Sequence, residues 1–302
     1  MSLSFAPVSL NDLDRIYRYT SMYGEGSCQH SPVSMYSLAE KYADMVCEQD
    51  DALYTLRSNL CDDTHRVYLA PMTGRDIKDA FAKIIKDAES YNKKASFITL
   101  TETYARELEN GFPGMFDIRE ERDLAEYMYR ADIMAGFLGS SLRKRRAEVN
   151  TFYNRYGERA SVSEITKDDL DELLSFERKW MSANRETHDA DALDRDARMI
   201  EKQFEVFDKL GLFGVILRID GVMAGFAYGV KLNDEVYDVI VEKADRDIPH
   251  AYKALRMVSA KQCSESCSLI NYEEDVGIPG LRYMKTSYKP EYLLRKFIAI
   301  GR

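Results

Sequence analysis

Three strand-like runs at residues 213–242 constrain the fold of this chain more than any other feature of its sequence. Phe213–Ile219 and Val222–Lys231 are rich in β-branched and aromatic residues. Between them stands Asp220–Gly221, a residue pair that two-residue hairpin turns prefer. A third run, Val236–Glu242, follows after a short polar connection. We therefore predict a meander of three antiparallel strands.

Helical patterns surround this meander. Residues 167–184 and 192–210 precede it, and residues 251–263 follow it. Strand-like runs at 269–272 and 293–300 complete the C-terminal half. Helices that alternate with strands in this order predict a mixed α/β fold, an α+β arrangement around a mixed sheet.

The N-terminal half mixes the same two kinds of element. Hydrophobic residues at helical spacing predict helices at 9–19, 77–92 and 101–110. Alternating or β-rich runs predict strands at 51–57, 66–70, 95–100, 116–118 and 125–129, the first two forming a hairpin. The two halves share enough of this order to indicate duplicated domains.

Length and composition allow two cores of ordinary size. The chain has 302 residues, of which 45% are hydrophobic, and this excludes disorder as its main state. It has no apolar run of the roughly 18 residues that a membrane span needs, and Met1–Ser9 lacks the pattern of a secretory signal. Five cysteines without the spacing of a disulfide framework suit a reducing compartment. We therefore expect a soluble, cytoplasmic protein without disulfides or a metal site.

The charge is unevenly distributed. The formal net charge is −9, yet residues 142–159 contain six basic and two acidic side chains, and residues 243–302 contain eleven and seven. Two basic segments in an acidic chain can attract an anionic ligand to one place. Ordinary mixing of surface charges explains the same counts equally well.

Three motifs carry a resemblance to a known family. They are LRKRRAEVNTFYNRYG (Leu142–Gly157), EKADRDIPHAYKALRM (Glu242–Met257) and INYEEDVGIPGLRYMKTSYKP (Ile270–Pro290). These segments resemble the uncharacterised family related to the catalytic C-terminal domain of phosphatidylglycerol lysyltransferases, whose fold is similar to that of the GNAT acyltransferase superfamily. The resemblance implies two tandem GNAT-like domains: residues 1–141, a basic interdomain helix at 142–159, and residues 160–302 with the donor site. The membrane-embedded half of those lysyltransferases is not in this sequence, so we expect no integral membrane contact.

The resemblance also implies a phosphate-binding loop. The superfamily pattern falls on Arg246, Pro249 and Ala251, and His250 stands where the family has glycine. The free amides of a helix that begins here attract phosphate. Asp247 offers a simpler alternative, since an acidic residue caps a helix without any ligand. The cofactor-binding residues implied are Val241, Lys243, Arg246, His250, Ala251, Tyr252, Asn271, Arg282 and Lys285.

Acyl transfer to an amine needs a route for the proton that the amine loses. Glu242 and Asp275 are the candidates for that route, and Tyr288 is the candidate acid toward the leaving group, as the resemblance implies. Each carboxylate also has a structural alternative. Glu242 can pair with Lys243 or Arg246, and Asp275 can cap the turn through Gly277. Arg282 and Lys285 suit phosphate groups, or else form a solvated basic face.

Three functions remain open. The first hypothesis is a soluble acyltransferase that moves an acyl group from acyl-coenzyme A to an amine, with coenzyme A as the product. The second is an aminoacyl-tRNA-dependent aminoacyltransferase, which the family and the basic segment at 142–159 support. The third is a catalytically silent ligand-binding module, suggested by Pro249 and His250 in the phosphate loop. The sequence indicates neither the acceptor nor the oligomeric state.

Overall fold

The computed structural model describes residues 3–184 and 190–302. The chain divides into two compact units, each of which contains a mixed β-sheet. The first unit comprises residues 1–127, 274–282 and 293–302, and the second comprises residues 128–273 and 283–292. The sequence predicts one boundary near 141–160, whereas the division follows the return of the C-terminal chain to the first unit.

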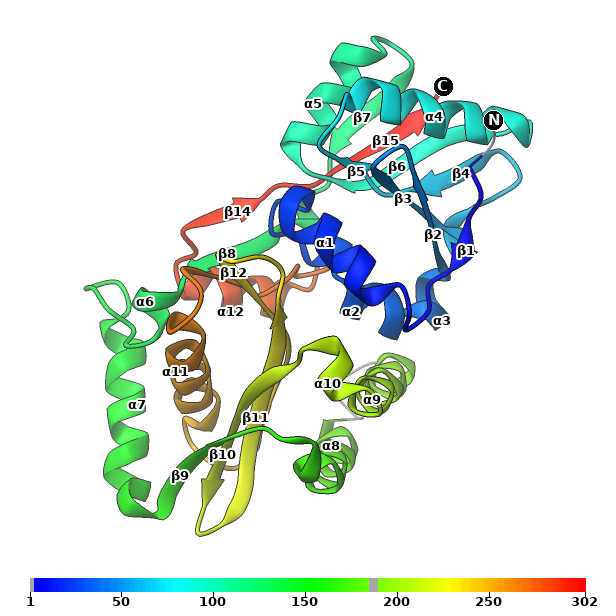
Figure 1. Cartoon of the computed structure of the whole chain (residues 1–302). Helices are drawn as coiled ribbons and strands as arrows, with labels where there is room; N and C mark the ends of the chain where they lie inside the picture. Colours follow the sequence, from blue (N-terminus) through cyan, green and yellow to red (C-terminus); the bar gives the residue numbers. More distant parts are fainter. Residues whose placement is uncertain (1–2, 185–189) are drawn as a thin grey trace. The chain divides into compact units, whose positions relative to one another are not determined.

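The first unit contains the sheet β1-β2-β3-β4-β6-β15-β7, with β5 paired to β3 (Figure 1). Its strands are β1 (Ala6–Pro7), β2 (Asp44–Gln49), β3 (Ala52–Arg57), β4 (His65–Tyr68), β5 (Met72–Thr73), β6 (Lys94–Leu100), β7 (Phe116–Glu120) and β15 (Phe297–Gly301). Its helices are α1 (Leu13–Tyr23), α2 (Pro32–Ser37), α3 (Ala39–Tyr42), α4 (Ile77–Ser90) and α5 (Glu102–Gly111). Side chains of α4 and α5 pack on one face with Tyr54 and Phe97, and α1 and α2 pack against Leu53 and Val46.

A buried ion pair lies in this first unit. Lys296, just before β15, places its Nζ 2.7 Å from Oε1 of Glu126, and both side chains are fully buried. The same Nζ donates to Ser27 Oγ, which in turn donates to Glu126. A buried charge is tolerated when it is paired and hydrogen-bonded. This contact therefore fixes where the C-terminal chain enters the first unit.

The second unit largely contains the other sheet, β14-β8-β13-β12-β11-β10-β9. Its strands are β8 (Glu126–Arg130), β9 (Ala160–Glu164), β10 (Phe213–Ile219), β11 (Val222–Lys231), β12 (Val236–Ala244), β13 (Leu269–Asn271) and β14 (Tyr292–Leu294). Its helices are α6 (Ala131–Met134), α7 (Arg143–Tyr156), α8 (Leu170–Asn184), α9 (Ala190–Phe204), α10 (Phe207–Leu210) and α11 (Ala251–Ser264). Helix α12 (Pro279–Ser287) begins in the first unit and ends in the second.

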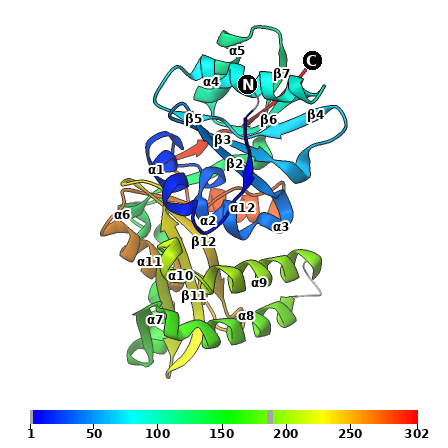
Figure 2. The same ribbon diagram turned by 45° about the vertical axis from the view of Figure 1, so that its right-hand side comes forward.

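Helices cover both faces of the second sheet (Figures 1 and 2). Helix α11 packs on one face, where Leu255 meets Leu217 and Ala227, and α7 packs on α11. Helices α8 and α9 cover the other face, where Phe176 contacts Phe226 and Phe204 contacts Tyr228. Adjacent residues of one strand alternate between these two faces.

The second sheet parts beside β12. This strand pairs with β11 along most of its length, but its parallel pairing with β13 covers only Val236–Asp238. On its other side, the register shifts between Tyr228 and Gly229 of β11. The C-terminal part of β12, after Asp238, therefore has no strand partner on the β13 side. Residues there and at the start of α11 could bind a ligand at this edge.

The meander predicted from residues 213–242 is confirmed, with Asp220 and Gly221 at its turn. The predicted pairing of 51–57 with 66–70 is present, since β3 and β4 are antiparallel neighbours, but only Leu56 and Tyr68 are in register. The sequence analysis missed β2, which pairs with the other edge of β3. One other expectation was wrong. The predicted helix at 192–210 ends at Phe204, and the short helix α10 follows.

Candidate active site

Glu242 and Arg256 form the centre of the polar cluster beside the parted edge. Glu242 is on β12, and Arg256 is on α11, which packs over the same face. The Arg256 guanidinium donates to both carboxylate oxygens, with Nη2 2.5 Å from Oε1 and Nε 3.0 Å from Oε2. Both side chains are buried. Such a two-point contact orients the carboxylate as well as neutralising it.

Two tyrosine rings enclose the same guanidinium. Its carbon lies 5.0 Å from the ring centre of Tyr272 and 4.4 Å from that of Tyr288. The Tyr272 hydroxyl also donates to Glu242 Oε2 at 3.3 Å. Burial raises the pKa of both phenols. Because they stay protonated at neutral pH, both are available as hydrogen-bond donors.

Basic side chains of α7 and α12 surround this cluster. Arg145 donates to Ser287 Oγ and lies over the Tyr288 ring. Lys285 is buried, and its Nζ donates to the Tyr272 carbonyl at 2.6 Å. The Tyr129 hydroxyl donates to the Lys285 carbonyl. Lys285 thus holds the segment that carries Tyr272, a contact that the predicted phosphate role did not include.

Helix α11 begins at the predicted phosphate loop. His250 adopts a left-handed backbone with φ of 67°, which explains why a glycine suits this position. Pro249 has no amide hydrogen, and the Ala251 amide already donates to the Ile248 carbonyl. Asp247 does not cap this helix through its side chain, since His250 is the N-cap and no side-chain cap bond forms there. Arg246 is exposed.

A second set of contacts lies at the end of β12 on the α8 face. Lys243 is buried and pairs with Glu177 at 2.5 Å. Its Nζ lies 4.6 Å from the ring centre of Trp180, and the Arg246 guanidinium lies 5.7 Å from the same centre. The Trp180 Nε1 donates to the Tyr252 hydroxyl at 2.9 Å.

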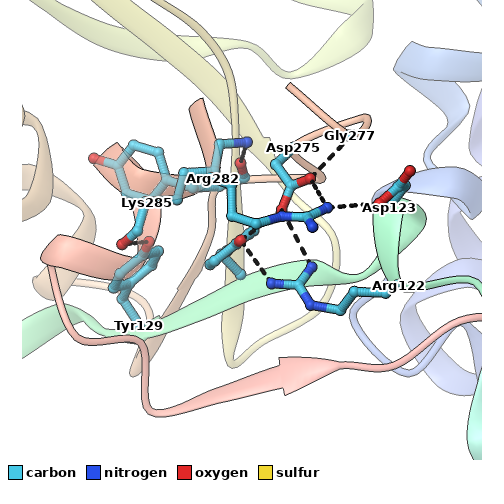
Figure 3. A network of polar contacts seen from close by, with 9 residues as sticks. Arg122, Asp123, Tyr129, Asp275, Gly277, Arg282 and Lys285 are labelled. Carbon is cyan, nitrogen blue, oxygen red and sulfur yellow. Dashed lines mark hydrogen bonds and ion pairs between the residues drawn. The ribbon is translucent and has the colours of Figure 1, made fainter. Parts of the chain in front are cut away.

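Asp275 belongs to a different network, in the first unit (Figure 3). Its buried carboxylate accepts from Arg122, Arg282 and the Tyr127 hydroxyl, and from the Gly277 amide. Although burial opposes ionisation, the hydrogen bonds from Arg282 and Tyr127 lower the pKa of Asp275 well below its usual value. So weak a base is poorly suited to accept a proton at neutral pH.

Arg282 also belongs to this network. Its guanidinium donates to both oxygens of Asp275 and to Asp123 at 2.6 Å. The predicted capping of the turn through Gly277 is present, with the amide 3.0 Å from Asp275 Oδ1. These contacts hold the loop before α12.

The structure brings together only part of the predicted set. Glu242 and Tyr288 meet through Arg256, while Lys243, Arg246 and Tyr252 meet around Trp180. Val241 and Asn271 are buried, and Asn271 Oδ1 accepts from the Glu273 amide. Sequence reasoning missed Arg256, Tyr272 and Trp180 as site residues.

The alternative that pairs Glu242 with Lys243 or Arg246 is wrong. Lys243 follows Glu242 on one strand and faces the other side of the sheet, where it meets Glu177. Strand alternation was the signal that could have excluded this pair. Its actual partner, Arg256, comes from α11, which packs over the same face as Glu242.

Two surface hollows lie away from these residues. One hollow, of about 770 Å³, lies at the C-terminal end of α11. Its lining includes the acidic side chains of Asp132, Asp234 and Glu265. The other, of about 480 Å³, lies between α5 and β7. Within residues 3–184 and 190–302, no three His, Cys, Asp or Glu side chains are grouped as metal ligands.

Comparison with known proteins identifies relatives along most of the chain. Residues 21–300 match the family model described as phosphatidylglycerol lysyltransferase, C-terminal. An uncharacterized protein of Mycoplasmoides gallisepticum is 22% identical over 295 residues, which cover 96% of this chain and 94% of that protein. A conserved protein of unknown function from Bacteroides thetaiotaomicron is 29% identical in its crystal structure, with a TM-score of 0.91 over 99% of this chain and 100% of that one.

More distant structures share the fold. The structure of L-PGS from Bacillus licheniformis has a TM-score of 0.66 at 12% identity, covering 95% of this chain and 91% of that one. FemX has a TM-score of 0.65 at 8% identity, covering 99% and 98%. The predicted mixed α/β fold is confirmed, with two mixed sheets and a fold like that of FemX. No helix in the described part of the chain is long and apolar enough to cross a bilayer.

Proposed function

Because the chain belongs to the phosphatidylglycerol lysyltransferase C-terminal family, we propose that it is an aminoacyltransferase. It takes an aminoacyl group from an ester donor, aminoacyl-tRNA, and passes it to an amine acceptor. The observation that carries the proposal is the cluster of Glu242, Arg256, Tyr272 and Tyr288 beside the parted edge of the second sheet.

The reaction sets the requirements for such a site. The acceptor nitrogen attacks the ester carbonyl carbon, a C–N bond forms, and the C–O bond to the ribose breaks. The nitrogen loses one proton and the ribose oxygen gains one, so the site needs an acceptor and a donor of protons. Glu242 is the carboxylate nearest the parted edge in this cluster, and the phenols of Tyr272 and Tyr288 supply O–H groups. Burial raises the pKa of both phenols, which keeps these protons available.

Arg256 gives the cluster its charge balance. Its guanidinium neutralises Glu242 and faces two aromatic rings. A preorganised cation also stabilises the negative charge that develops on a carbonyl oxygen during acyl transfer. We assign Arg256 to positioning Glu242, and Glu242 to the proton route.

Two observations favour an aminoacyl ester over acyl-coenzyme A as the donor. The family is described by a lysyl group, which is an aminoacyl group. The loop at 246–251 also offers few donors to a diphosphate, because Pro249 has no amide hydrogen and the Ala251 amide is bonded to Ile248. The other predicted phosphate ligands, Arg282 and Lys285, already have partners.

Acyl-coenzyme A remains the second candidate donor because of the start of α11. The left-handed backbone of His250 precedes a helix of 14 residues, whose N-terminus favours anions, and Arg246 is exposed beside it. Salt distinguishes the two donors. Binding of tRNA neutralises several phosphates and weakens steeply with ionic strength, whereas binding of coenzyme A changes far less.

A transfer assay tests the proposal. Bulk tRNA charged with labelled amino acids is incubated with the protein and a metabolite extract, and the label is followed into products that resist mild alkali. Esters of tRNA hydrolyse under these conditions, while amides survive. We expect label in amides with the unaltered protein and with Arg18→Ala, a change at an exposed residue of α1, and at least a tenfold lower rate with Glu242→Gln.

The result that would overturn the proposal is label transfer from acetyl-coenzyme A alone. The same holds if no labelled amide forms from charged tRNA while the Glu242→Gln protein and the unaltered protein bind acetyl-coenzyme A with equal affinity.

A further inference from the structure

The chain has a single tryptophan, and it lies near the end of β12 and the start of α11. Trp180 is in α8, is partly exposed, and meets residues from the end of β12 and the first turn of α11. Its hydrogen-bond partner Tyr252 is on α11, the helix that also carries Arg256, so Trp180 and the cluster around Glu242 adjoin the same end of β12.

Trp180 is held in a defined orientation. Its Nε1 donates to the Tyr252 hydroxyl at 2.9 Å, and the buried Lys243 ammonium lies 4.6 Å from its ring centre. Lys243 is fixed in turn by Glu177. The indole is therefore a rigid platform rather than a mobile surface side chain.

Arg246 extends this platform toward solvent. Its guanidinium lies 5.7 Å from the Trp180 ring centre, and the side chain is exposed. Nucleobases stack on aromatic rings and on planar guanidinium groups, and arginine also pairs with phosphate. A base, a guanidinium and an indole can thus form one stack, with the phosphate near the start of α11.

We propose that Trp180 and Arg246 form a binding site for the terminal adenosine of the donor. This inference rests on the proposed function, because both candidate donors contain the group. Aminoacyl-tRNA ends in an adenosine that carries the aminoacyl ester, and coenzyme A contains an adenosine phosphate. The shared ligand chemistry is a purine nucleoside with an adjacent phosphate.

Trp180 emission reports the site directly, because the chain has one tryptophan. Titration with adenosine 5′-monophosphate is expected to quench it in a saturable manner, and ribose 5-phosphate, which lacks the base, is not. Arg246→Ala is expected to lower the affinity for adenosine 5′-monophosphate about tenfold or more. Arg246 is exposed, so this variant should fold, and its thermal midpoint verifies that.

Arg18→Ala is the matched control. Arg18 is also exposed and lies 5.0 Å from an aromatic ring centre, that of Tyr19, but on α1 of the first unit. Its loss is expected to leave the titration unchanged. The inference is overturned if adenosine 5′-monophosphate leaves the emission unchanged, or if Arg246→Ala and Arg18→Ala bind it as the unaltered protein does.

Further ligands distinguish the source of the adenosine. An RNA minihelix that ends in CCA is compared with one that ends in CC, and coenzyme A with phosphopantetheine. If the minihelix that ends in CC binds more weakly than the one that ends in CCA, the adenosine belongs to tRNA. If phosphopantetheine binds more weakly than coenzyme A, the adenosine belongs to coenzyme A. Equal affinity within both pairs overturns the inference.

The transfer assay separates this inference from the proposed function. If Trp180→Leu transfers label with an unchanged KM for the donor, the adenosine site is wrong and the aminoacyltransferase stands. If the nucleotide binds as expected but the unaltered protein forms no amide from charged tRNA, the proposed function fails and the nucleotide site remains.

Discussion

The carboxylate of Glu242 and the guanidinium of Arg256 meet across the face of the second sheet, 14 residues apart in the chain, with both oxygens in hydrogen bonds. The pair is buried and enclosed by two tyrosine rings. A buried pair has large consequences when one partner is removed, because the other charge stays in the interior.

We therefore expect Arg256→Ala to lower the free energy of unfolding by about 3–5 kcal/mol. Glu242 would be left buried without its cation. Chemical denaturation monitored by circular dichroism measures the change, and the exposed Arg155→Ala, expected within about 0.5 kcal/mol of the unaltered protein, is the control. A loss below about 1 kcal/mol in Arg256→Ala would show that water reaches Glu242 easily.

The pair of Lys296 and Glu126 allows a comparison of single and double variants. Lys296→Met removes the cation beside the buried Glu126 carboxylate, so we expect a loss of about 3–5 kcal/mol. Adding Glu126→Leu removes the uncompensated charge and should restore most of that loss. A double variant as unstable as the sum of the two single variants would instead show that the two charges act independently.

His30 makes stability depend on pH. Burial, with the nearby Lys296 and Arg57, lowers its pKa from 6.5 to about 3. Below pH 6.5 the unfolded chain binds a proton that the folded protein does not, so stability falls as the pH decreases toward 3, by about 1.4 kcal/mol per pH unit at most. Unfolding at pH 7, 6 and 5 measures the slope.

Asp44 has the opposite effect on stability over part of this pH range, because its protonation stabilises the folded protein as the pH decreases. Burial raises its pKa to about 6, only partly offset by Arg57, so the folded protein binds the extra proton between about pH 6 and 3.8. Comparison with His30→Gln isolates the histidine contribution. Equal slopes in the two proteins would mean that His30 does not titrate with a lowered pKa.

Gly229 permits the close approach of β11 and β12 at the register shift. A Cβ at this position would lie 1.7 Å from the Asp238 carbonyl oxygen. Gly229→Ala should therefore separate the strands beside the parted edge, with a loss of more than about 2 kcal/mol and of transfer activity. Gly280→Ala, where a Cβ meets nothing within 4 Å, is the control. Similar thermal midpoints for both variants would contradict the prediction.

Local patterns predicted most elements of the second unit. Residues 213–242 contain the β-forming runs and the turn pair that produce β10–β12, and helical spacing located α11 and α8 within a few residues. The motif at 242–257 also indicated that the chain turns from strand to helix near His250. These features depend on neighbours in the sequence, so the sequence alone determines them.

Pairing across long distances was beyond such patterns. Residues 293–300 read as a strand of the C-terminal half, yet β15 pairs with β6 and β7 of the first sheet. The two candidate carboxylates also belong to different networks, which local patterns could not predict. Asp275 is paired with Arg122 and Arg282 in the first unit, and Glu242 is paired with Arg256 in the second. Neither partner could be chosen from spacing along the chain.

The sequence thus determined which segments become strands and helices, and which residues carry charge or an aromatic ring. Only the tertiary structure decided which of them meet. Propensity and periodicity act over a few residues, whereas an ion pair or a strand register is selected by packing between segments that are distant in the chain.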